Sequence, residues 1–292
     1  MSRSTFSKHH SRFSPNYPHR MMQGEGALVW CDDGKQYVDL GQGLGGTGIF
    51  GHSPAFISDA IEDVLKEGIT IGHLPLLYEG ELATKLRELL PWAEESRFCL
   101  NGTDAVAGAV RLARHVTKRR KVLIFEGSYH GASTGDWFAS SLQIAPGIDP
   151  TSHTPLVCQW NNHVQLQRLL CYKDDAAAIV IEFGLTDPTP AFLDSIKEFK
   201  EASKCLLILD EIVTGFRFSL GGLQQRYQLP VDLVCYGKAM GSGIPVAAIC
   251  GKREHMRYFD LGYTQQPVFM SFTHAGNALG APTPTTQYRG ST

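Results

Sequence analysis

The stretch Asp232-Leu-Val-Cys-Tyr-Gly-Lys238-Ala-Met-Gly-Ser-Gly243 is a short apolar strand that ends in a lysine with glycines on both sides. Upstream of it, Leu206-Leu-Ile-Leu-Asp210 is a second apolar run, and this one ends in a carboxylate. The carboxyl ends of strands in an open α/β sheet border one crevice, where ligands usually bind. We therefore expect the Lys238 amine and the Asp210 carboxylate to face the same crevice.

An amine and an acid in this arrangement fit pyridoxal phosphate. Lys238 would form a Schiff base with the cofactor's aldehyde, and Asp210 would keep the pyridine nitrogen protonated so that the ring can act as an electron sink. The pair alone leaves simpler interpretations open. Most lysines are solvated surface residues, and an aspartate at a strand-to-helix junction often caps the helix.

A phosphate site is predicted further upstream. Phe98-Cys-Leu-Asn101-Gly102-Thr103 leads into a pattern of apolar residues at helical spacing, so that Gly102 and Thr103 would open a helix. The unpaired N–H groups and the dipole of a helix N-terminus suit a phosphate, although Asn-Gly-Thr-Asp is also a common capping sequence. The run Lys121-Val-Leu-Ile-Phe125 is then followed by Tyr129-His130-Gly131, whose tyrosine could lie flat against a heteroaromatic ring. Together these features favour pyridoxal phosphate.

Four motifs in order, Asn101-Gly-Thr, Tyr129-His-Gly, Asp210-Glu-Ile-Val-Thr-Gly-Phe-Arg217 and Gly237-Lys238, resemble those of the class III aminotransferases, within them the glutamate-1-semialdehyde aminomutase-like group. The resemblance runs from about Gly24 to Leu279. It implies an α/β protein of fold type I among pyridoxal-phosphate-dependent transferases. Such a protein has a three-layer α/β/α large domain with a mostly parallel sheet, here with a partial small domain built from the N-terminal segment.

The resemblance also implies roles for single residues. Lys238 is similar to the lysine that carries the cofactor, and Asp210 to the partner of the pyridine nitrogen. The other implied cofactor-binding residues are Asn101, Gly102, Thr103, Tyr129, His130, Glu182, Ile212 and Thr273. Ile212 would pack on the ring face opposite Tyr129, and Thr273 would reach the phosphate of a partner subunit, which implies a homodimer. For Glu182, a plain charge at a strand end is an equally open interpretation.

Two departures from the family pattern leave the substrate undetermined. Val213 stands where relatives often carry a glutamine or methionine near the ring hydroxyl, and Asn101 replaces the serine of the commoner Ser-Gly-Thr form. The resemblance therefore implies a small amino or keto substrate without naming it. The reaction would be amino transfer, either between two molecules or within one.

Composition agrees with a globular enzyme. The chain has 292 residues with 43% hydrophobic content, enough for a large core, and its net charge of −2 gives no support for nucleic-acid binding. The sequence contains no run of 18 apolar residues that would indicate a membrane span. The N-terminus also lacks the apolar centre of a secretory signal. The seven cysteines are scattered without a Cys-x-x-Cys motif, and the histidines show no metal-ligand spacing. We expect reduced thiols, a cytoplasmic location and no metal site.

The domain organisation follows from the periodicity. Residues 1–50 are expected to form a polar arm, extended or poorly ordered to about residue 23, and a hairpin around Asp33-Gly34. Residues 51–279 would form the cofactor-binding large domain. It would begin with amphipathic helices near 54–67 and 78–90, with Leu65 on an apolar face, and continue with strands near 121, 177, 205, 232 and 246 alternating with helices near 103, 164, 191 and 222. Residues 280–292, rich in proline and threonine, are expected to be an irregular tail.

Two alternatives come from other functional classes. The relatives' C-terminal portion does not follow Leu279, so the chain could be a truncated homologue that binds pyridoxal phosphate, has weak or no activity and acts as an interaction partner. Alternatively, Gly41-Gln-Gly-Leu-Gly-Gly46 fits the Gly-x-Gly-x-x-Gly spacing of nicotinamide-dependent enzymes. That fingerprint requires a strand before it and a helix directly after it, whereas a hairpin precedes this stretch and a glycine-rich loop continues it.

Overall fold

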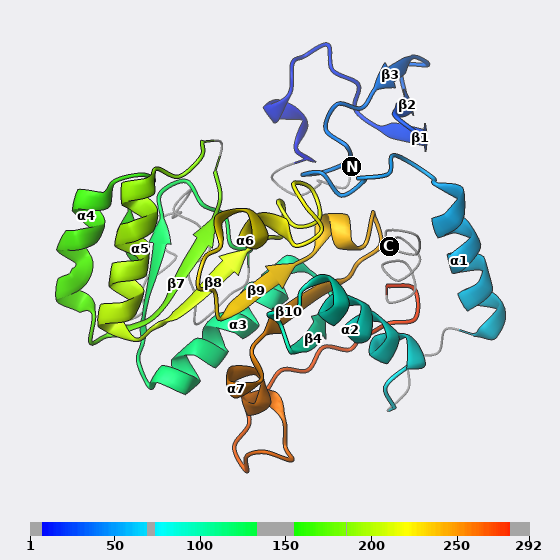
Figure 1. The fold of residues 1–292 in the computed structure, drawn as a ribbon. Helices are drawn as coiled ribbons and strands as arrows, with labels where there is room; N and C mark the ends of the chain where they lie inside the picture. Colours follow the sequence, from blue (N-terminus) through cyan, green and yellow to red (C-terminus); the bar gives the residue numbers. More distant parts are fainter. Residues whose placement is uncertain (1–7, 69–73, 133–154, 185, 281–292) are drawn as a thin grey trace.

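A seven-stranded sheet forms the centre of the molecule (Figure 1). The computed structural model describes residues 8–68, 74–132, 155–184 and 186–280. The strands follow each other across the sheet in the order β4-β10-β9-β8-β7-β5-β6. Their bounds are β4 Glu95–Cys99, β5 Lys121–Phe125, β6 Leu156–Cys158, β7 Ala176–Glu182, β8 Leu206–Asp210, β9 Leu233–Tyr236 and β10 Ala247–Gly251.

The sheet is mostly parallel, as the sequence predicts. Strands β6, β5, β7, β8 and β9 pair in parallel, whereas β10 runs antiparallel to both of its neighbours, β4 and β9. The five predicted strands are present as β5, β7, β8, β9 and β10. The two edge strands β4 and β6 were not predicted, because β4 begins with the polar sequence Glu-Ser-Arg and β6 has only three residues.

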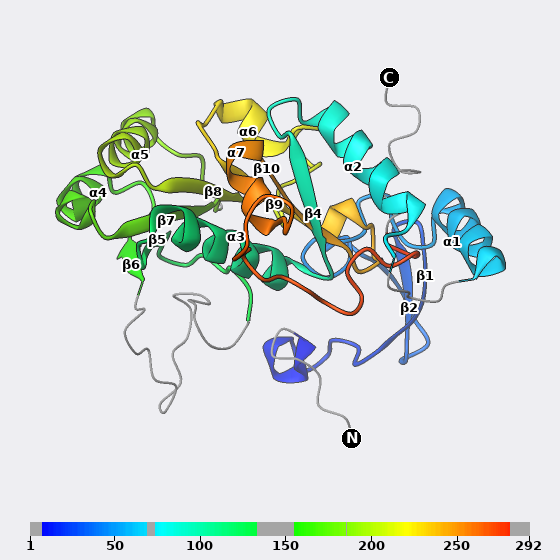
Figure 2. The same cartoon turned by 90° about the horizontal axis from the view of Figure 1, so that it is seen from below.

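Helices cover both faces of the sheet and make three layers, which Figure 2 shows from below. One face packs against α2, α4, α5 and α6 through side chains such as Leu207 and Leu209, and the other face packs against α3 and α7 through side chains such as Ile208. Successive strand residues point to opposite faces, so both faces of a fully buried run must be apolar. The helix bounds are α2 Leu77–Leu89, α3 Gly102–Thr117, α4 His163–Arg168, α5 Pro190–Ser203, α6 Gly222–Tyr227 and α7 Arg253–Met256.

Helix α3 shows how the local sequence sets the edge of the future site. The Asn101 side chain caps it by accepting a hydrogen bond from the Asp104 N–H at 3.0 Å. Apolar residues at three-to-four spacing, including Val106 and Val110, are buried against the sheet. The helix therefore begins at Gly102, beside the carboxyl edge of the sheet, as predicted. Three short 3₁₀ segments complete this part of the chain: η3 Leu169–Tyr172, η4 Lys238–Met240 and η5 Arg257–Phe259.

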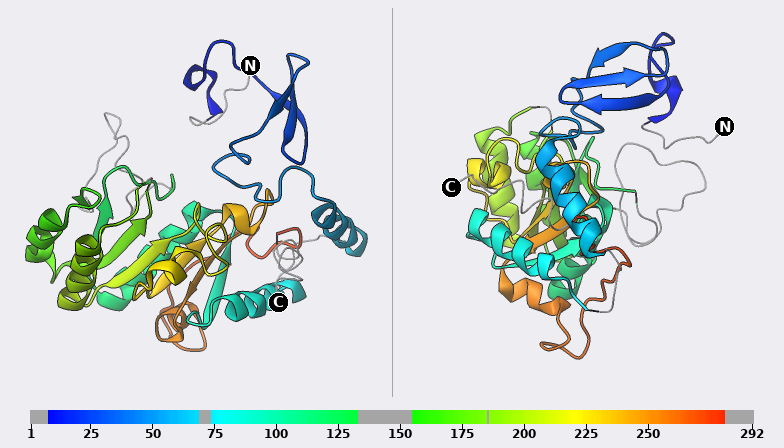
Figure 3. Two further views of the ribbon diagram at one scale, coloured as in Figure 1. Left: turned by 45° about the horizontal axis from the view of Figure 1, so that its top comes forward. Right: turned by 90° about the vertical axis from the view of Figure 1, so that its right-hand side faces the viewer.

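A three-stranded antiparallel sheet from the N-terminal segment stands apart from the large sheet (Figure 3). Its strands are β1 Met21–Glu25, β2 Leu28–Cys31 and β3 Gln36–Val38, and the predicted Asp33-Gly34 turn joins the last two. The arm was predicted to be extended or poorly ordered up to about residue 23, and its last residues do enter the extended strand β1. The 3₁₀ turn η2, His10–Arg12, was not predicted. The mostly exposed side chains of β1 carry no alternating apolar pattern, so only its backbone pairing with β2 identifies it.

Helix α1, Ala55–Glu67, follows this sheet and matches its predicted position. Its Ile57 and Val64 are buried, but Leu65 is 52% exposed, which corrects the predicted apolar face. The predicted tail lies outside the described residues after Gly280, as does the start of the arm before residue 8. Among the described helices, none combines the length and the hydrophobicity needed to cross a bilayer.

Candidate functional site

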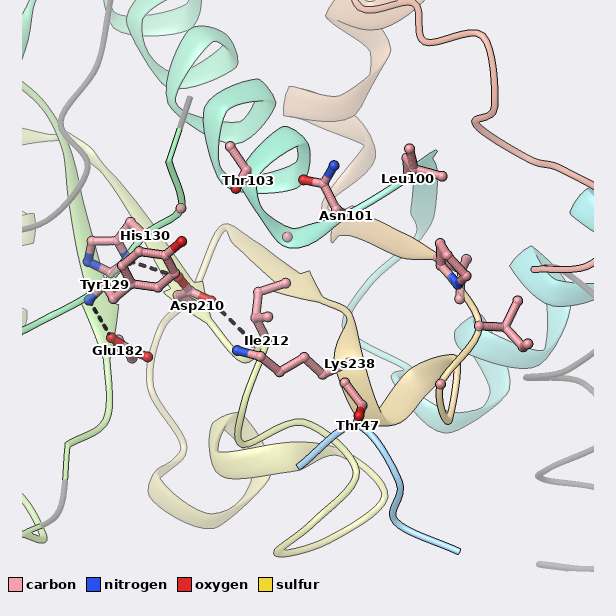
Figure 4. Close-up of a pocket in the computed structure, with 16 residues that line it drawn as sticks. Thr47, Leu100, Asn101, Thr103, Tyr129, His130, Glu182, Asp210, Ile212 and Lys238 are labelled. Atoms are coloured by element: carbon pink, nitrogen blue, oxygen red, sulfur yellow. Dashed lines mark hydrogen bonds and ion pairs between the residues drawn. The ribbon is translucent and has the colours of Figure 1, made fainter. Parts of the chain in front are cut away.

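A cavity of about 350 Å³ opens at the carboxyl edge of the parallel strands (Figure 4). Its volume lies within the range typical of small-molecule sites, roughly 300–1,000 Å³. Strands β7, β8 and β9, the loop after β5 and the start of α3 all contribute to it. The lining residues are Thr47, Leu100, Asn101, Gly102, Thr103, Tyr129, His130, Gly131, Glu182, Asp210, Ile212, Lys238, Gly243, Ile244, Pro245 and Val246.

Lys238 enters this cavity from the end of β9. It opens the 3₁₀ turn η4 with φ at +42°, a left-handed conformation that is unfavourable for a residue with a side chain. Burial lowers the pKa of the Lys238 amine, the Asp210 and Glu182 carboxylates oppose that shift, and the Arg217 guanidinium adds to it. The geometry therefore favours a lysine that can lose its proton more easily than a solvated one.

Asp210 is the last residue of β8 and is almost fully buried. Its Oδ2 lies 2.8 Å from His130 Nδ1, and its Oδ1 accepts the Ile212 N–H at 3.1 Å. Helix α6 begins only at Gly222, so Asp210 caps no helix and the capping interpretation is set aside. The carboxylate is held from two sides at the floor of the cavity.

The start of α3 forms the opposite end of the cavity. The first N–H groups of a helix have no partner within the helix, so they are available to an anion. Thr103 Oγ1 accepts the Ala132 N–H at 3.2 Å, which ties this end to the loop after β5. A Cβ on Gly102 would lie 2.9 Å from Ile212 Cδ1, and one on Gly131, at φ +102°, would lie 2.6 Å from Thr103 Oγ1. Both glycines are therefore required by close packing around this end of the cavity.

Tyr129 and Glu182 form the wall between these two ends. The Tyr129 N–H donates to Glu182 Oε2 at 2.7 Å, while the Tyr129 side chain is 48% exposed and lies at the cavity (Figure 4). Burial raises the pKa of the Glu182 carboxyl, and the neighbouring Asp210 raises it further. Glu182 thus ends β7 and also lines the cavity, and its role near a reacting centre stays a prediction.

The structure brings together nine of the ten residues that the sequence singles out, and their roles remain predictions. Thr273 is the exception: it is exposed and does not line the cavity. Sequence reasoning assigned no role to Thr47, Leu100 or residues 243–246, all of which line it. In the sequence, only the glycine-dense stretch before Thr47 could have indicated that Thr47 lies at the site. That stretch follows β3 and opens no helix before Ala55, so the nicotinamide-type fingerprint is wrong.

Comparison with known proteins points to one family. The family model described as Aminotransferase class-III matches residues 10–282. The glutamate-1-semialdehyde 2,1-aminomutase of Methanosphaera stadtmanae is 36% identical over 277 residues, covering 90% of this chain and 64% of that protein. The glutamate-1-semialdehyde 2,1-aminomutase 2 of Brevibacillus brevis is 35% identical over 271 residues, which cover 88% of this chain and 62% of that protein. The chain thus spans somewhat less than two thirds of the length of these curated relatives.

Solved structures agree with the family match. An omega-transaminase from Sphaerobacter thermophilus superposes with a TM-score of 0.86 at 28% identity, covering 96% of this chain and 68% of that one. A transaminase with PLP bound superposes with a TM-score of 0.85 at 27% identity, covering 95% and 68%. The predicted fold, a three-layer α/β/α transferase of fold type I, is confirmed. The chain belongs to the class III aminotransferase family.

Proposed function

We propose that this chain is the cofactor-binding part of a pyridoxal-phosphate-dependent aminotransferase or aminomutase, with Lys238 as the amine that holds the cofactor. A single observation supports the proposal most strongly. One cavity contains a lysine with a lowered pKa, a buried carboxylate and an open helix N-terminus. These are the groups that an aldehyde, a pyridine nitrogen and a phosphate would each require.

The residues present fit this cofactor. Gly102 and Thr103 at the start of α3 would hold the phosphate, and the tight packing of Gly102 on Ile212 brings that anion site beside an apolar side chain suited to a ring face. Tyr129 would supply an aromatic contact to the ring. Asp210 would bind the pyridine nitrogen. When bound, pyridoxal phosphate supplies an electron sink for a carbanion, which no amino-acid side chain can provide.

Asp210 and His130 would act as a pair. A carboxylate with one oxygen held by His130 and the other by the Ile212 N–H cannot rotate freely, so its charge stays directed at one point. That fixed negative charge would keep a proton on a pyridine nitrogen. The burial of both side chains strengthens this electrostatic effect, since little water screens it.

Lys238 would also act as the base. Its lowered pKa increases the fraction of neutral Nζ, which can take a proton from a substrate carbon and return it to an adjacent position. Glu182, whose pKa is raised by burial, lies on the same wall as a second group able to carry a proton. Two groups able to carry a proton on one wall fit amino transfer within a single substrate as well as between two substrates.

We propose a small amino or keto compound as the substrate and a homodimer as the working assembly. The relatives reported above include glutamate-1-semialdehyde 2,1-aminomutases and an omega-transaminase, all of which move amino groups. Thr273, which is exposed and does not line the cavity of its own chain, is available to contact a partner subunit. All seven cysteines are free, which fits a reducing compartment such as the cytoplasm.

The test is capture of the cofactor on one named lysine. Wild-type chain is mixed with pyridoxal phosphate, its absorbance is recorded, and borohydride is added to convert the lysine–aldehyde linkage into a stable secondary amine. Peptide mass spectrometry should then find the cofactor on Lys238, and Lys238→Ala should lose the label while keeping its circular dichroism. Label on another lysine, or none, contradicts the proposal. A change in absorbance after addition of an amino acid indicates amino transfer, whereas an unchanged spectrum indicates binding alone.

A further inference from the structure

The glycine-rich segment of residues 41–48, here called the glycine loop, lies directly against Lys238. A Cβ on Gly45 would be 3.0 Å from Lys238 Cε and 3.5 Å from its Nζ, so the loop backbone touches the lysine stem. Two residues further on, Thr47 lines the cavity. The loop is therefore a wall of the site, although it comes from the N-terminal segment and not from the large sheet (Figures 3 and 4).

One side of the glycine loop is fixed by Asp39. Its Oδ1 accepts the Gly41 N–H at 2.9 Å and its Oδ2 accepts the Gly43 N–H at 2.7 Å. The same Oδ2 lies 2.9 Å from His52 Nε2, beyond the far end of the loop. A backbone hydrogen bond from the Gly48 N–H to the Gln42 carbonyl oxygen at 2.8 Å also closes the loop on itself. None of these contacts reaches Lys238.

A second set of contacts to the glycine loop comes from Arg217, at the end of the motif that begins with Asp210. Its Nη1 donates to Gln42 Oε1 at 2.6 Å, and its Nη2 donates to the Gly46 carbonyl oxygen. Gly46 has φ at +78°, and a Cβ there would collide with the guanidinium, so the glycine allows this close approach. A planar fork with several donors is suited to such a two-point contact, unlike the ammonium of a lysine.

Arg217 also carries a charge that no acidic group among the described residues neutralises in an ion pair. None of the ion pairs among the described residues includes it, and its Nε is buried without a hydrogen-bond partner in that part of the chain. Its two acceptors, an amide side chain and a backbone carbonyl, are neutral. The positive charge is therefore felt by nearby groups, and Lys238 is one of them.

We propose that Arg217 is a positioning residue: it holds the glycine loop against the Lys238 side chain and places its own charge beside that amine. The inference rests on the proposed function, because it concerns access to the lysine that would hold the cofactor. Among the described residues, the charged or titratable groups that act on Lys238 or line its cavity are Arg217, Asp210, Glu182, His130 and Tyr129. Of these, Arg217 alone contacts the glycine loop.

The first test measures the loop itself. Hydrogen exchange is recorded by mass spectrometry on cofactor-free chain for wild type, Arg217→Met and Arg217→Lys. Methionine removes both donors and the charge at similar length, and lysine keeps the charge without the planar fork. Peptides covering residues 41–48 should exchange roughly tenfold faster or more in both variants, since each loses a charge-assisted hydrogen bond. Peptides of β8 should stay protected, which shows that the fold is kept.

The second test measures Lys238. An amine-selective acylating reagent is applied across a pH series, and the label on the Lys238 peptide is quantified. In Arg217→Met the profile should move to higher pH, because a neighbouring positive charge is lost, whereas in Arg217→Lys it should stay near that of wild type. In both variants the limiting rate at high pH should rise as the loop opens. The matched control is Arg226→Met, an exposed arginine paired with Asp187 at 3.5 Å, which should behave as wild type in both tests.

The outcomes separate this inference from the proposed function. The inference is overturned if the glycine loop of Arg217→Met exchanges hydrogen within about twofold of the wild-type rate. It is also overturned if the loop exchanges faster but the pH profile and the limiting rate of Lys238 acylation are unchanged, because Arg217 would then have only a structural role. Neither measurement needs the cofactor. If wild type fails to capture pyridoxal phosphate on Lys238, the proposed function fails on its own, while the exchange and acylation results still decide the role of Arg217.

Discussion

His130 and Asp210 are joined across the carboxyl edge of the sheet, with His130 Nδ1 2.8 Å from Asp210 Oδ2 and side chains that are 0% and 3% exposed. His130 comes from the loop after β5, Asp210 ends β8, and β7 lies between those two strands. The pair therefore reaches over the end of β7, where Glu182 receives the Tyr129 N–H. Two carboxylates share one buried edge, and each is held by a different part of the Tyr129-His130 dipeptide.

Asp210→Asn should abolish most turnover without unfolding the protein. The amide keeps the size and part of the hydrogen bonding but loses the charge that would keep a pyridine nitrogen protonated. We expect a loss on the order of thousands-fold in kcat, equivalent to several kcal/mol of transition-state stabilisation. Steady-state kinetics at saturating cofactor and a thermal melt check both parts. Turnover close to wild type would show that the ring is held elsewhere.

Gly131→Ala should weaken pyridoxal phosphate binding far more than Gly127→Ala. Both glycines have positive φ, at +102° and +82°, so alanine is strained at either position. The new Cβ would collide at residue 131, at 2.6 Å from Thr103 Oγ1, whereas a Cβ added at residue 127 would meet no atom of the described residues within 4 Å. We expect at least about a tenfold higher Kd by absorbance titration for Gly131→Ala relative to Gly127→Ala. Equal Kd values would mean that Thr103 does not shape the binding site.

Glu211→Gln should flatten the dependence of stability on pH. Glu211 is fully buried, and burial raises its pKa to about 7 from an ordinary 4.5 despite bonds from Thr214 Oγ1 at 2.7 Å and the Gln224 N–H at 2.9 Å. Between these two values the folded chain keeps a proton that the unfolded chain has lost, so the free energy of unfolding falls as pH rises through that window.

The measurement is urea unfolding at pH 5 and pH 8. The fall in unfolding free energy should be smaller in Glu211→Gln than in wild type, by up to a few kcal/mol. The control is Glu201→Gln, whose side chain is 80% exposed, and this variant should retain the wild-type pH dependence. An unchanged pH dependence in Glu211→Gln would show that Glu211 is already ionised at low pH in the folded chain.

Leu86→Ala should destabilise the fold by about 2–5 kcal/mol, because Leu86 is 1% exposed in the core between α2 and the sheet and its truncation leaves a cavity. Leu77→Ala in the same helix should change the unfolding free energy by no more than roughly 0.5 kcal/mol, since Leu77 is 76% exposed. Denaturant unfolding of the two variants side by side gives the comparison. A large loss in Leu77→Ala would mean that its exposed side chain is covered in solution.

The sequence predicts most of the large domain because buried parallel strands appear as continuous apolar runs between helical patterns. It does not predict β4, where Glu95, Ser96 and Arg97 interrupt the apolar run at the sheet edge, or β1, whose side chains are mostly exposed. In both strands the order comes from backbone pairing with a neighbour. Such pairing is a tertiary property that local composition does not encode.

The candidate site likewise has residues that the sequence predicts and contacts that it does not predict. Lys238, Asp210 and Gly102 follow directly from their places at strand ends and a helix start, where the chemistry of each residue type can be interpreted locally. The contact between Gly45 and Lys238 could not be predicted, because the two residues are almost two hundred positions apart (238 minus 45 is 193) and no periodicity links them. The same holds for the hydrogen bonds from Arg217 to the loop.

The reversed direction of β10 has a consequence for how the chain can vary. Because β10 runs antiparallel to β9, the connection of residues 237–246 returns at the carboxyl edge, and residues 243–246 line the cavity before the chain enters β10. A parallel strand would have needed a crossover to the other edge and left this side open. Insertions between Met240 and Val246 should therefore be tolerated poorly, since they lengthen a segment that lines the cavity directly after Lys238. Changes in length elsewhere on the surface leave this hairpin-like return untouched.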